Sequence, residues 1–277
     1  MKRLAIFTAT RWELNAVRRA IPDGMQRLTG HRGFAGRRGQ WHVILIQTGV
    51  GMAKAKEACR IMLNEQTVDL ALSSGFSCAL SPSDTGDLLI GTHVVTWGGP
   101  NDSAHISARP VSDSGLKHPP EKRNENVAGQ YAASGMLHCT PDVVETALRT
   151  AQAAGLPFRA GRFVTVPRVL WRADEKRQVA VETQAIGLDM ESWALGVPVA
   201  DRQVPFAIVR TVSDLLDEDL PVDFNLFLHP AGWPKGTLAC LARPSSLLGL
   251  SRLRSQTEIA SGRLTTFFQR FLDGLHS

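Results

Sequence analysis

Short apolar segments alternate with amphipathic segments along most of the chain. Residues 2–10 form an apolar run that ends in small polar residues, and residues 11–21 follow with apolar positions at helical spacing. This pattern predicts a strand, a tight turn and a helix. Residues 33–51 predict a hairpin with its turn near 38–40, whose second strand is nearly all apolar, as in strands buried on both faces. Residues 51–65 predict an amphipathic helix.

The same alternation continues toward the C-terminus. We predict strands at residues 68–82, 86–97, 161–170, 185–190 and 205–214, and helices at residues 140–155, 172–183 and 191–203. The strand at 68–82 is expected to break at Ser73 to Gly75. Thr140 and Pro141 are typical of an N-cap and a first helical position. Alternating strands and helices favour one α/β domain with a central mixed β-sheet flanked by helices.

Two segments depart from this pattern. Residues 98–135 are rich in Gly, Pro, Asn, Ser and charges, and we interpret them as a polar loop or insertion within the α/β domain of residues 1–229. Residues 230–277 predict Pro- and Gly-punctuated helices, a basic helical C-terminal extension of the same domain. This extension has six basic and two acidic residues, so it carries most of the net charge of +5.

The composition is that of a globular protein, with 277 residues, 43% hydrophobic and 21% charged. The opening "MKRLAIFTAT" does not resemble a secretory signal, because its apolar run is short and Glu13 follows soon after. The longest apolar runs are too short to span a bilayer. We therefore expect a soluble, cytoplasmic protein.

Cysteine and histidine spacing gives no sign of a metal site. The cysteines are scattered and form no CxxC pair, and the histidines form no HxxxH or HxH spacing. We expect free thiols and no metal. The basic tail lacks the aromatic signature of RNA-binding modules, so we expect no nucleic-acid partner.

Polar residues follow several predicted strands. These groups are residues 8–13, 48–51, 74–78, 189–191 and 213–214. Ligands of α/β sheets bind beyond the carboxyl ends of the strands, so these groups are expected to meet on one rim. Within "AIGLDMESWALG", the acid Glu191 stands in a largely apolar segment and is predicted to face a polar ligand with hydroxyl groups.

Each of these residues also has an ordinary structural explanation. The glycines of "TGVG" can serve a tight turn alone, Glu13 can be a solvated first-turn acid, and Asp214 can be a helix N-cap. Asp189 is expected to cap or to pair, and Arg210 to pair with one of the acids. No GxSxG, GxGxxG or Walker motif is present, which argues against a serine hydrolase and a dinucleotide site.

Taken together, five ordered segments resemble the nucleoside phosphorylase superfamily, and in particular its branch of methylthioadenosine/S-adenosylhomocysteine nucleosidases. The segments are "AIFTATRWE", "TGVGMAKA", "SGFSCALSPSDTGD", "DMES" and "RTVSD". The resemblance covers residues 1–214. It implies cleavage of the N-glycosidic bond of an adenine nucleoside, with no cofactor, in a homo-oligomer for which a dimer is favoured.

The resemblance also implies roles for residues. Asp214 would be the general acid at N7 of the purine, and Glu13 would orient and deprotonate the attacking water. Glu191 would accept hydrogen bonds from the ribose hydroxyls. The remaining predicted substrate contacts are Met190 against the sugar, Ser213, Ser77 and Cys78 positioning the acid and the base, Val169 (or Leu170 or Trp171) against the base, and an amide of Gly49.

This sequence departs from the family pattern at three points, the first being the polar segment 98–135, which is longer than expected in compact nucleosidases. The small "AGG" turn of the family is Ser77-Cys78-Ala79 here, and the expected base-stacking Phe is missing near "VPRVLW". Hydrolysis is favoured over phosphorolysis, because Glu13 would repel a phosphate dianion. Phosphorolysis, with inorganic phosphate as co-substrate held by Arg11 and nearby amides, stays open, as does a non-catalytic nucleoside-binding module.

A narrower resemblance involves "LDMESWAL", "RTVSDLLDEDLP" and the helical tail. These segments are similar to the hopanoid-associated phosphorylase group. That resemblance implies removal of adenine from adenosylhopane. It also suggests peripheral membrane contact through the basic tail, although helices that only cover the sheet explain the tail as well.

Overall fold

The predicted strands and helices form in the predicted order. The computed structural model describes residues 1–21, 24–98, 135–228 and 244–275. The strands are β1 (Lys2–Thr8), β2 (Gln26–Arg27), β3 (Gly33–Arg38), β4 (Trp41–Gln47), β5 (Leu70–Ala79), β6 (Leu88–Thr96), β7 (Met136–His138), β8 (Phe158–Thr165), β9 (Gly187–Asp189) and β10 (Phe206–Asp214). The helices are α1 (Arg11–Arg19), α2 (Met52–Glu65), α4 (Pro141–Ala153), α5 (Ala173–Thr183), α6 (Ser192–Ala200), the 3-10 turn η1 (Phe224–Phe227) and α8 (Pro244–Gly274).

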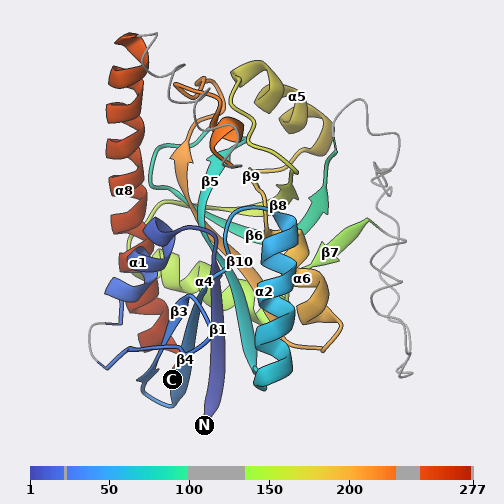
Figure 1. Cartoon of the computed structure of the whole chain (residues 1–277), viewed down its shortest axis with the longest axis vertical. Helices are drawn as coiled ribbons and strands as arrows, with labels where there is room; N and C mark the ends of the chain where they lie inside the picture. The colour runs from blue at the N-terminus through green and yellow to red at the C-terminus, as the bar shows by residue number, and fades with distance from the viewer. Residues whose placement is uncertain (22–23, 99–134, 229–243, 276–277) are drawn as a thin grey trace.

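The strands form one mixed sheet, as predicted, in the order β10-β6-β8-β9-β5-β1-β4-β3-β2, and β7 pairs with β6 outside this order (Figure 1). Strand β5 lies at its centre, parallel to β1 and β10 and antiparallel to β9. Because β10 also pairs with β6, the strands β5, β10, β6, β8 and β9 close into a ring. This closure gathers the ends of distant strands, and the strand pattern of the sequence did not predict it.

Two local expectations differ from the structure. Strand β5 does not break at Ser73 to Gly75 but continues to Ala79, with Gly75 at φ +150°. Pro141 begins α4 as predicted, yet Thr140 gives it no side-chain cap. The Thr140 hydroxyl instead accepts a hydrogen bond from the Phe206 amide at 3.0 Å, which ties α4 to β10.

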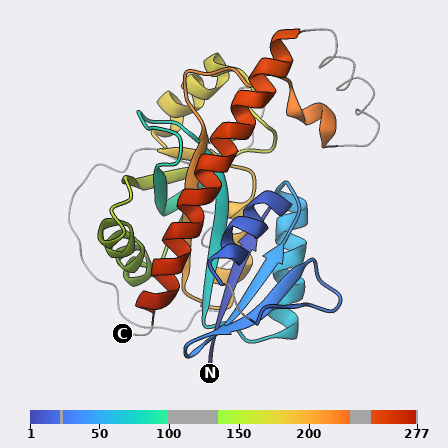
Figure 2. The same cartoon turned by 90° about the vertical axis from the view of Figure 1, so that its left-hand side faces the viewer.

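Helices cover both faces of the sheet. Helices α1, α4 and α8 lie together on one side, where α8 crosses next to the other two (Figure 2). Helix α2 packs against α6 on the other side (Figure 1). The predicted polar loop at 98–135 lies outside the described residues apart from Gly98 and Gly135.

Helix α8 is part of the core. The sequence predicts several helices after residue 230, whereas residues 244–274 form one continuous helix, and residues 229–243 lie outside the described part. Its inner face carries fully buried apolar side chains at helical spacing: Ala260, Leu264, Phe267, Phe268, Phe271 and Leu272. Burying each of the larger ones stabilises the fold by about 1.5–3 kcal/mol, so we expect the stability of the whole domain to depend on this helix.

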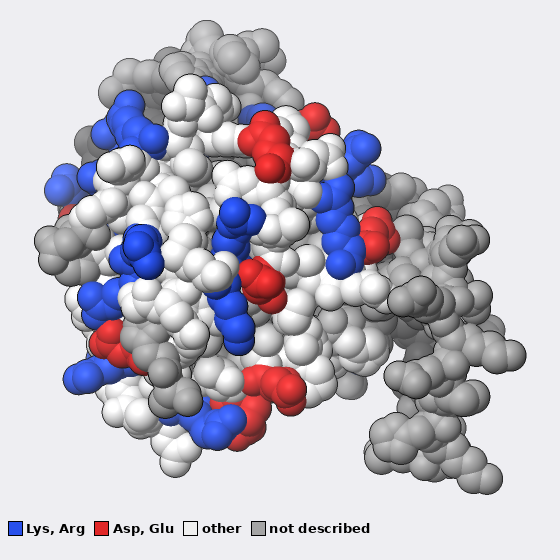
Figure 3. Space-filling view, turned by 90° about the horizontal axis from the view of Figure 1, so that it is seen from below, with Lys and Arg blue, Asp and Glu red and all other residues white. Residues whose placement is uncertain are grey.

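The surface charges are mixed on the face seen from below. Lys and Arg are scattered there among Asp and Glu and do not gather into one stripe (Figure 3). Within the described residues, no helix is long and apolar enough to cross a membrane. The same part of the chain contains no group of three or more His, Cys, Asp or Glu arranged to hold a metal ion.

Candidate active site

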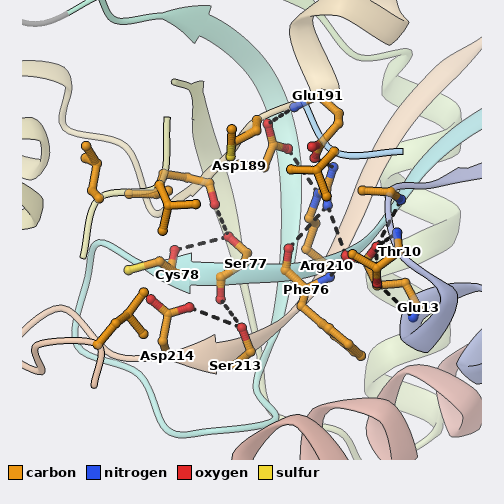
Figure 4. A pocket seen from close by; sticks show the side chains of 17 residues that line it. Thr10, Glu13, Phe76, Ser77, Cys78, Asp189, Glu191, Arg210, Ser213 and Asp214 are labelled. Atoms are coloured by element: carbon orange, nitrogen blue, oxygen red, sulfur yellow. Dashed lines mark hydrogen bonds and ion pairs between the residues drawn. The ribbon is translucent and has the colours of Figure 1, made fainter. Parts of the chain in front are cut away.

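A cavity of about 200 Å³ opens where the carboxyl ends of β1, β5, β9 and β10 meet (Figure 4). The sequence predicted one rim for these strand ends, and the structure places most of the predicted residues there. Those that line the cavity are Glu13, Ser77, Cys78, Val169, Met190, Glu191, Ser213 and Asp214. Gly49 is the exception. Its amide donates to the Ala9 carbonyl at 3.1 Å and holds a turn, while Val50 lines the cavity instead.

Arg210 occupies the centre of the polar half of the site. Its side chain is 2% exposed and faces three carboxylates. The closest is Asp189, whose Oδ2 lies 3.0 Å from Nε, followed by Glu191 Oε2 at 3.7 Å from Nη2 and Glu13 Oε1 at 3.8 Å from Nη1. The prediction that Arg210 pairs with one of the acids is confirmed by Asp189. The two further carboxylates facing the same guanidinium, Glu191 and Glu13, were not predicted as its partners.

Asp189 organises the turn that carries Glu191. Its Oδ1 accepts hydrogen bonds from the Thr165 hydroxyl at 2.8 Å and from the amides of Ser192 and Glu191 at 3.1 and 3.2 Å. Its Oδ2 accepts from the Ser192 hydroxyl and pairs with Arg210. Asp189 therefore both caps and pairs, as the sequence led us to expect, and is not free to react.

Glu13 is held by the backbone around it. Its Oε2 accepts from the amides of Ala9 and Thr10 at 2.9 and 2.7 Å and from the Thr10 hydroxyl at 3.0 Å, in a capping box of α1. Its Oε1 accepts from the Phe76 amide at 2.8 Å. The residue is 4% exposed, so the alternative of a solvated first-turn acid is wrong. Oε1, with one short hydrogen bond, keeps a lone pair for a molecule in the cavity.

Glu191 is buried beside the second glycine of the "TGVG" turn. Its Oε1 accepts from the Gly51 amide at 2.8 Å, and the residue is 4% exposed. Burial raises the pKa of the Glu191 carboxyl to about 7; Arg210 opposes this shift, while Asp189 and Glu13 add to it. The acid within the apolar segment thus faces Arg210, Gly51 and the cavity.

Asp214 lies at the opposite end of the cavity from Glu13 (Figure 4). Its Oδ1 accepts from the Ser213 hydroxyl at 3.1 Å, and its Oδ2 accepts from the Lys176 ammonium at 3.0 Å. No helix begins at Asp214 in the described residues, so the N-cap alternative is wrong. The sequence did not single out Lys176, because a lysine in a polar helix normally points to solvent.

The wall between these acids is apolar. Val169, Leu170, Leu188 and Met190 line it, and Trp171, the third residue considered for the base wall, does not. Sequence reasoning missed Asn225, whose amide accepts from the Val169 amide and donates to the Val169 carbonyl, each at 2.8 Å. Asn225 thereby fixes the loop after β8 against η1.

The thiol of Cys78 lies in the same wall. Burial raises the pKa of this thiol well above its ordinary value, so it stays neutral near pH 7. Ser77 turns its hydroxyl toward the Leu188 carbonyl at 2.8 Å. Ser77, Cys78 and Ala79, which stand where the family pattern has "AGG", are three small buried residues at the end of β5.

Comparison with known sequences finds one matching protein family and relatives that are nucleosidases. Residues 3–229 match the model of the phosphorylase superfamily. A 5'-methylthioadenosine/S-adenosylhomocysteine nucleosidase of Anoxybacillus flavithermus is 24% identical over 231 residues, 82% of this chain and 92% of that protein.

Solved structures show the same fold. The nucleosidase of that name from Helicobacter pylori, in complex with butyl-thio-DADMe-Immucillin-A, superposes with a TM-score of 0.69 at 17% identity, covering 99% of this chain and 98% of that one. The futalosine hydrolase of Helicobacter pylori gives a TM-score of 0.62 at 17% identity, covering 92% and 97%.

Proposed function

We propose that this chain, which belongs to the phosphorylase superfamily, hydrolyses the N-glycosidic bond of an adenine nucleoside and releases adenine. The observation that carries the proposal is the placement of Glu13, Glu191 and Asp214 around one cavity. Nucleosidases among the relatives, such as that of Anoxybacillus flavithermus, support the same reaction class.

The three acids fit three requirements of the reaction. As the bond from C1′ to N9 breaks, the sugar becomes oxocarbenium-like and the purine gains negative charge. Asp214 would donate a proton to N7 of the leaving purine. Glu191 would accept hydrogen bonds from the ribose hydroxyls, with Met190 packed against the sugar. Water would attack C1′ and give its proton to Glu13, whose Oε1 has a lone pair free.

The apolar wall suits the flat faces of a purine. Val169 and Leu170 line the cavity together with Leu188 and belong to one apolar cluster with Cys78 and Met190. Such a wall excludes water and strengthens the charge interactions of the acids. Ser213 and Ser77 are proposed to position Asp214 and the base.

The charge balance supports water as the nucleophile. Among the described residues that line the cavity, Arg210 is the one cation, and three carboxylates already face it. A phosphate dianion needs cationic and amide donors. Arg11 is exposed and does not line the cavity, and the Gly49 amide is taken by Ala9. Phosphorolysis, with phosphate as co-substrate, is the weaker candidate, and we propose no cofactor.

For the 5′ substituent, we propose an apolar group, and adenosylhopane as the substrate. The motifs of the hopanoid-associated group and the apolar lining, which includes Val50 and Leu220, support this. Such a substrate requires a protein in the cytoplasm that reaches the membrane surface. The last apolar run of α8 is buried in the core and is excluded as a docking element, because Phe267, Phe268 and Phe271 are fully buried.

Membrane contact is therefore tested on the whole chain. Truncation before α8 would remove core residues, so co-sedimentation with anionic and neutral vesicles at low and high salt is the suitable measurement. Anionic-selective, salt-weakened binding supports docking.

We also propose that the protein is a homodimer. The proposal is supported by Trp12, which is 56% exposed and is the sequence neighbour of the cavity residue Glu13. Sedimentation equilibrium measures the oligomeric state.

The function itself is tested by product analysis. The protein is incubated with adenosine, methylthioadenosine and 5′-alkyl adenosines, with and without phosphate. Adenine and a free sugar without phosphate are the expected products. A sugar 1-phosphate formed only with phosphate would make the protein a phosphorylase. Adenine binding without turnover would make it a binding module.

A further inference from the structure

The Lys176 side chain is a buried ammonium group in contact with Asp214. It lies on α5, whose inward residues Ala173, Lys176, Val179 and Thr183 follow helical spacing. The residue is 0% exposed. Burying an ammonium costs several kcal/mol unless it is paired and hydrogen-bonded, so a lysine in this place needs a compensating arrangement.

All three N–H groups of Lys176 have acceptors. Nζ donates to Asp214 Oδ2 at 3.0 Å, to the Leu215 carbonyl at 3.1 Å and to the Glu218 carbonyl at 2.9 Å. Burial alone would lower the pKa of the Lys176 ammonium, but the attraction of Asp214 outweighs it and the pKa is raised. The ammonium is therefore charged and fixed in orientation.

These contacts determine how Asp214 faces the cavity. Oδ2 is engaged by Lys176, so Oδ1, which accepts from Ser213, is the oxygen left for a ligand. The loop behind Asp214 is tied to the same helix, because Asp219 accepts from the Ala173 amide at 2.7 Å and the Leu220 amide donates to the Trp171 carbonyl at 2.7 Å.

The other charged groups near Asp214 are paired with cations, neutral or, in the case of Asp219, hydrogen-bonded to the Ala173 amide. On the same loop, Asp217 pairs with Arg177 of α5 and Glu218 pairs with Arg252 of α8. The thiol of Cys78 on β5 is neutral at pH 7. Among the described residues, Lys176 is thus the cation in direct contact with Asp214.

We infer that Lys176 is a positioning residue for the general acid: it fixes the orientation of Asp214 by holding Oδ2, so that Oδ1 is the oxygen presented to the cavity. The inference rests on the proposed function. Replacing the ammonium by a neutral side chain removes a charge beside Asp214, so the pH dependence of activity is a readout that a purely structural role would not change.

The test compares the pH dependence of kcat/KM in the wild type, Lys176→Met and Lys176→Arg, with adenine release as readout. Lys176→Met should lower the maximal rate about 10- to 100-fold, because the acid is no longer held in place. Its alkaline limb should move up by about one pH unit or more. Lys176→Arg keeps the charge, so its limb should stay at the wild-type position.

A matched control and a double variant separate positioning from stability. Arg177→Met removes the neighbouring ion pair between α5 and the same loop, where both side chains are more than half exposed, and should leave rate and limb unchanged. In an Asp214→Asn background, Lys176→Met should change kcat less than about twofold, because Lys176 acts through Asp214. If Lys176→Met does not fold, Lys176→Gln takes its place with the same expected shift.

The outcomes are distinct. No adenine release by the wild type from any nucleoside overturns the proposed function. If the wild type is active but the alkaline limb of Lys176→Met or Lys176→Gln does not shift, the role of Lys176 is overturned. Additive losses of kcat in the double variant have the same meaning. Both results leave the proposed function standing.

Discussion

A Cβ atom on residue 75 would lie 2.2 Å from Oε1 of Glu13, so Gly75 and the Glu13 carboxylate exclude any side chain between them. The same Cβ would lie 2.9 Å from Nη1 of Arg210. Gly75 also has φ +150°, a conformation that favours glycine. The close approach lets the neighbouring Phe76 amide reach Oε1 of Glu13.

Gly75→Ala should therefore displace Glu13 and lower kcat about 100-fold or more, because an ångström of misplacement costs this much. Steady-state adenine release measures it. The control is Gly262→Ala on α8, where a Cβ meets nothing within 4 Å and activity should be unchanged. Full activity of Gly75→Ala would contradict the prediction, because it would mean that the position of Glu13 does not matter for catalysis and that Glu13 does not hold the attacking water.

Asp214→Asn should lower kcat about 10²- to 10⁴-fold, the range for losing a general acid. The variant should also melt at a lower temperature than the wild type, because the buried Lys176 loses its anionic partner. Rate and melting temperature are measured on the same sample. Activity within a factor of two of the wild type would remove Asp214 from the mechanism.

Glu191→Gln should stabilise the protein at alkaline pH while weakening ribose binding. Burial raises the pKa of Glu191 to about 7. A raised carboxyl pKa means that its contribution to stability is present below its ordinary value and is lost as pH rises through 7. The neutral Gln avoids that loss, so its melting temperature should exceed that of the wild type at pH 8.5 and match it near pH 5.

The same residue gives a matched test on the substrate side. A charge-assisted hydrogen bond is worth about 1.5–3 kcal/mol, so 2′-deoxy substrates should react at least tenfold more slowly with the wild type. The difference should shrink in Glu191→Gln. Equal reaction of both substrates with the wild type would mean that Glu191 does not hold the 2′-hydroxyl.

Much of the fold and part of the site could be predicted from the sequence because the signals are local. Apolar runs located β1, β9 and β10, and polar residues at or just after their ends located Glu13, Glu191 and Asp214. The pairing of Arg210 followed from a charge in an apolar strand, which needs a partner.

The missed features depend on contacts between distant segments. Lys176 is 38 residues from Asp214, and Asn225 is 56 residues from Val169. A lysine or asparagine in a polar stretch gives no local sign of such a partner. The ring closed by β10 and β6 is likewise a tertiary property, and it brings β9 beside β5. Gly49 was assigned to the substrate because nothing local showed that its amide is already used by Ala9.

Arg210→Met should be the most destabilising change at the site. Asp189, Glu191 and Glu13 would then be buried without a cation, since each side chain is at most 5% exposed. Breaking a buried ion pair in this way costs about 3–5 kcal/mol. Because the unpaired carboxylates bind protons more readily as pH falls, the loss in unfolding free energy should be larger at pH 8 than at pH 5.5. Urea titration at both pH values measures this loss.

Arg38→Met, which breaks the exposed pair with Asp273, is the control and should cost at most about 1 kcal/mol at either pH. An equal loss for Arg210→Met at both pH values would mean that packing around the guanidinium, and not its charge, holds the three acids in place.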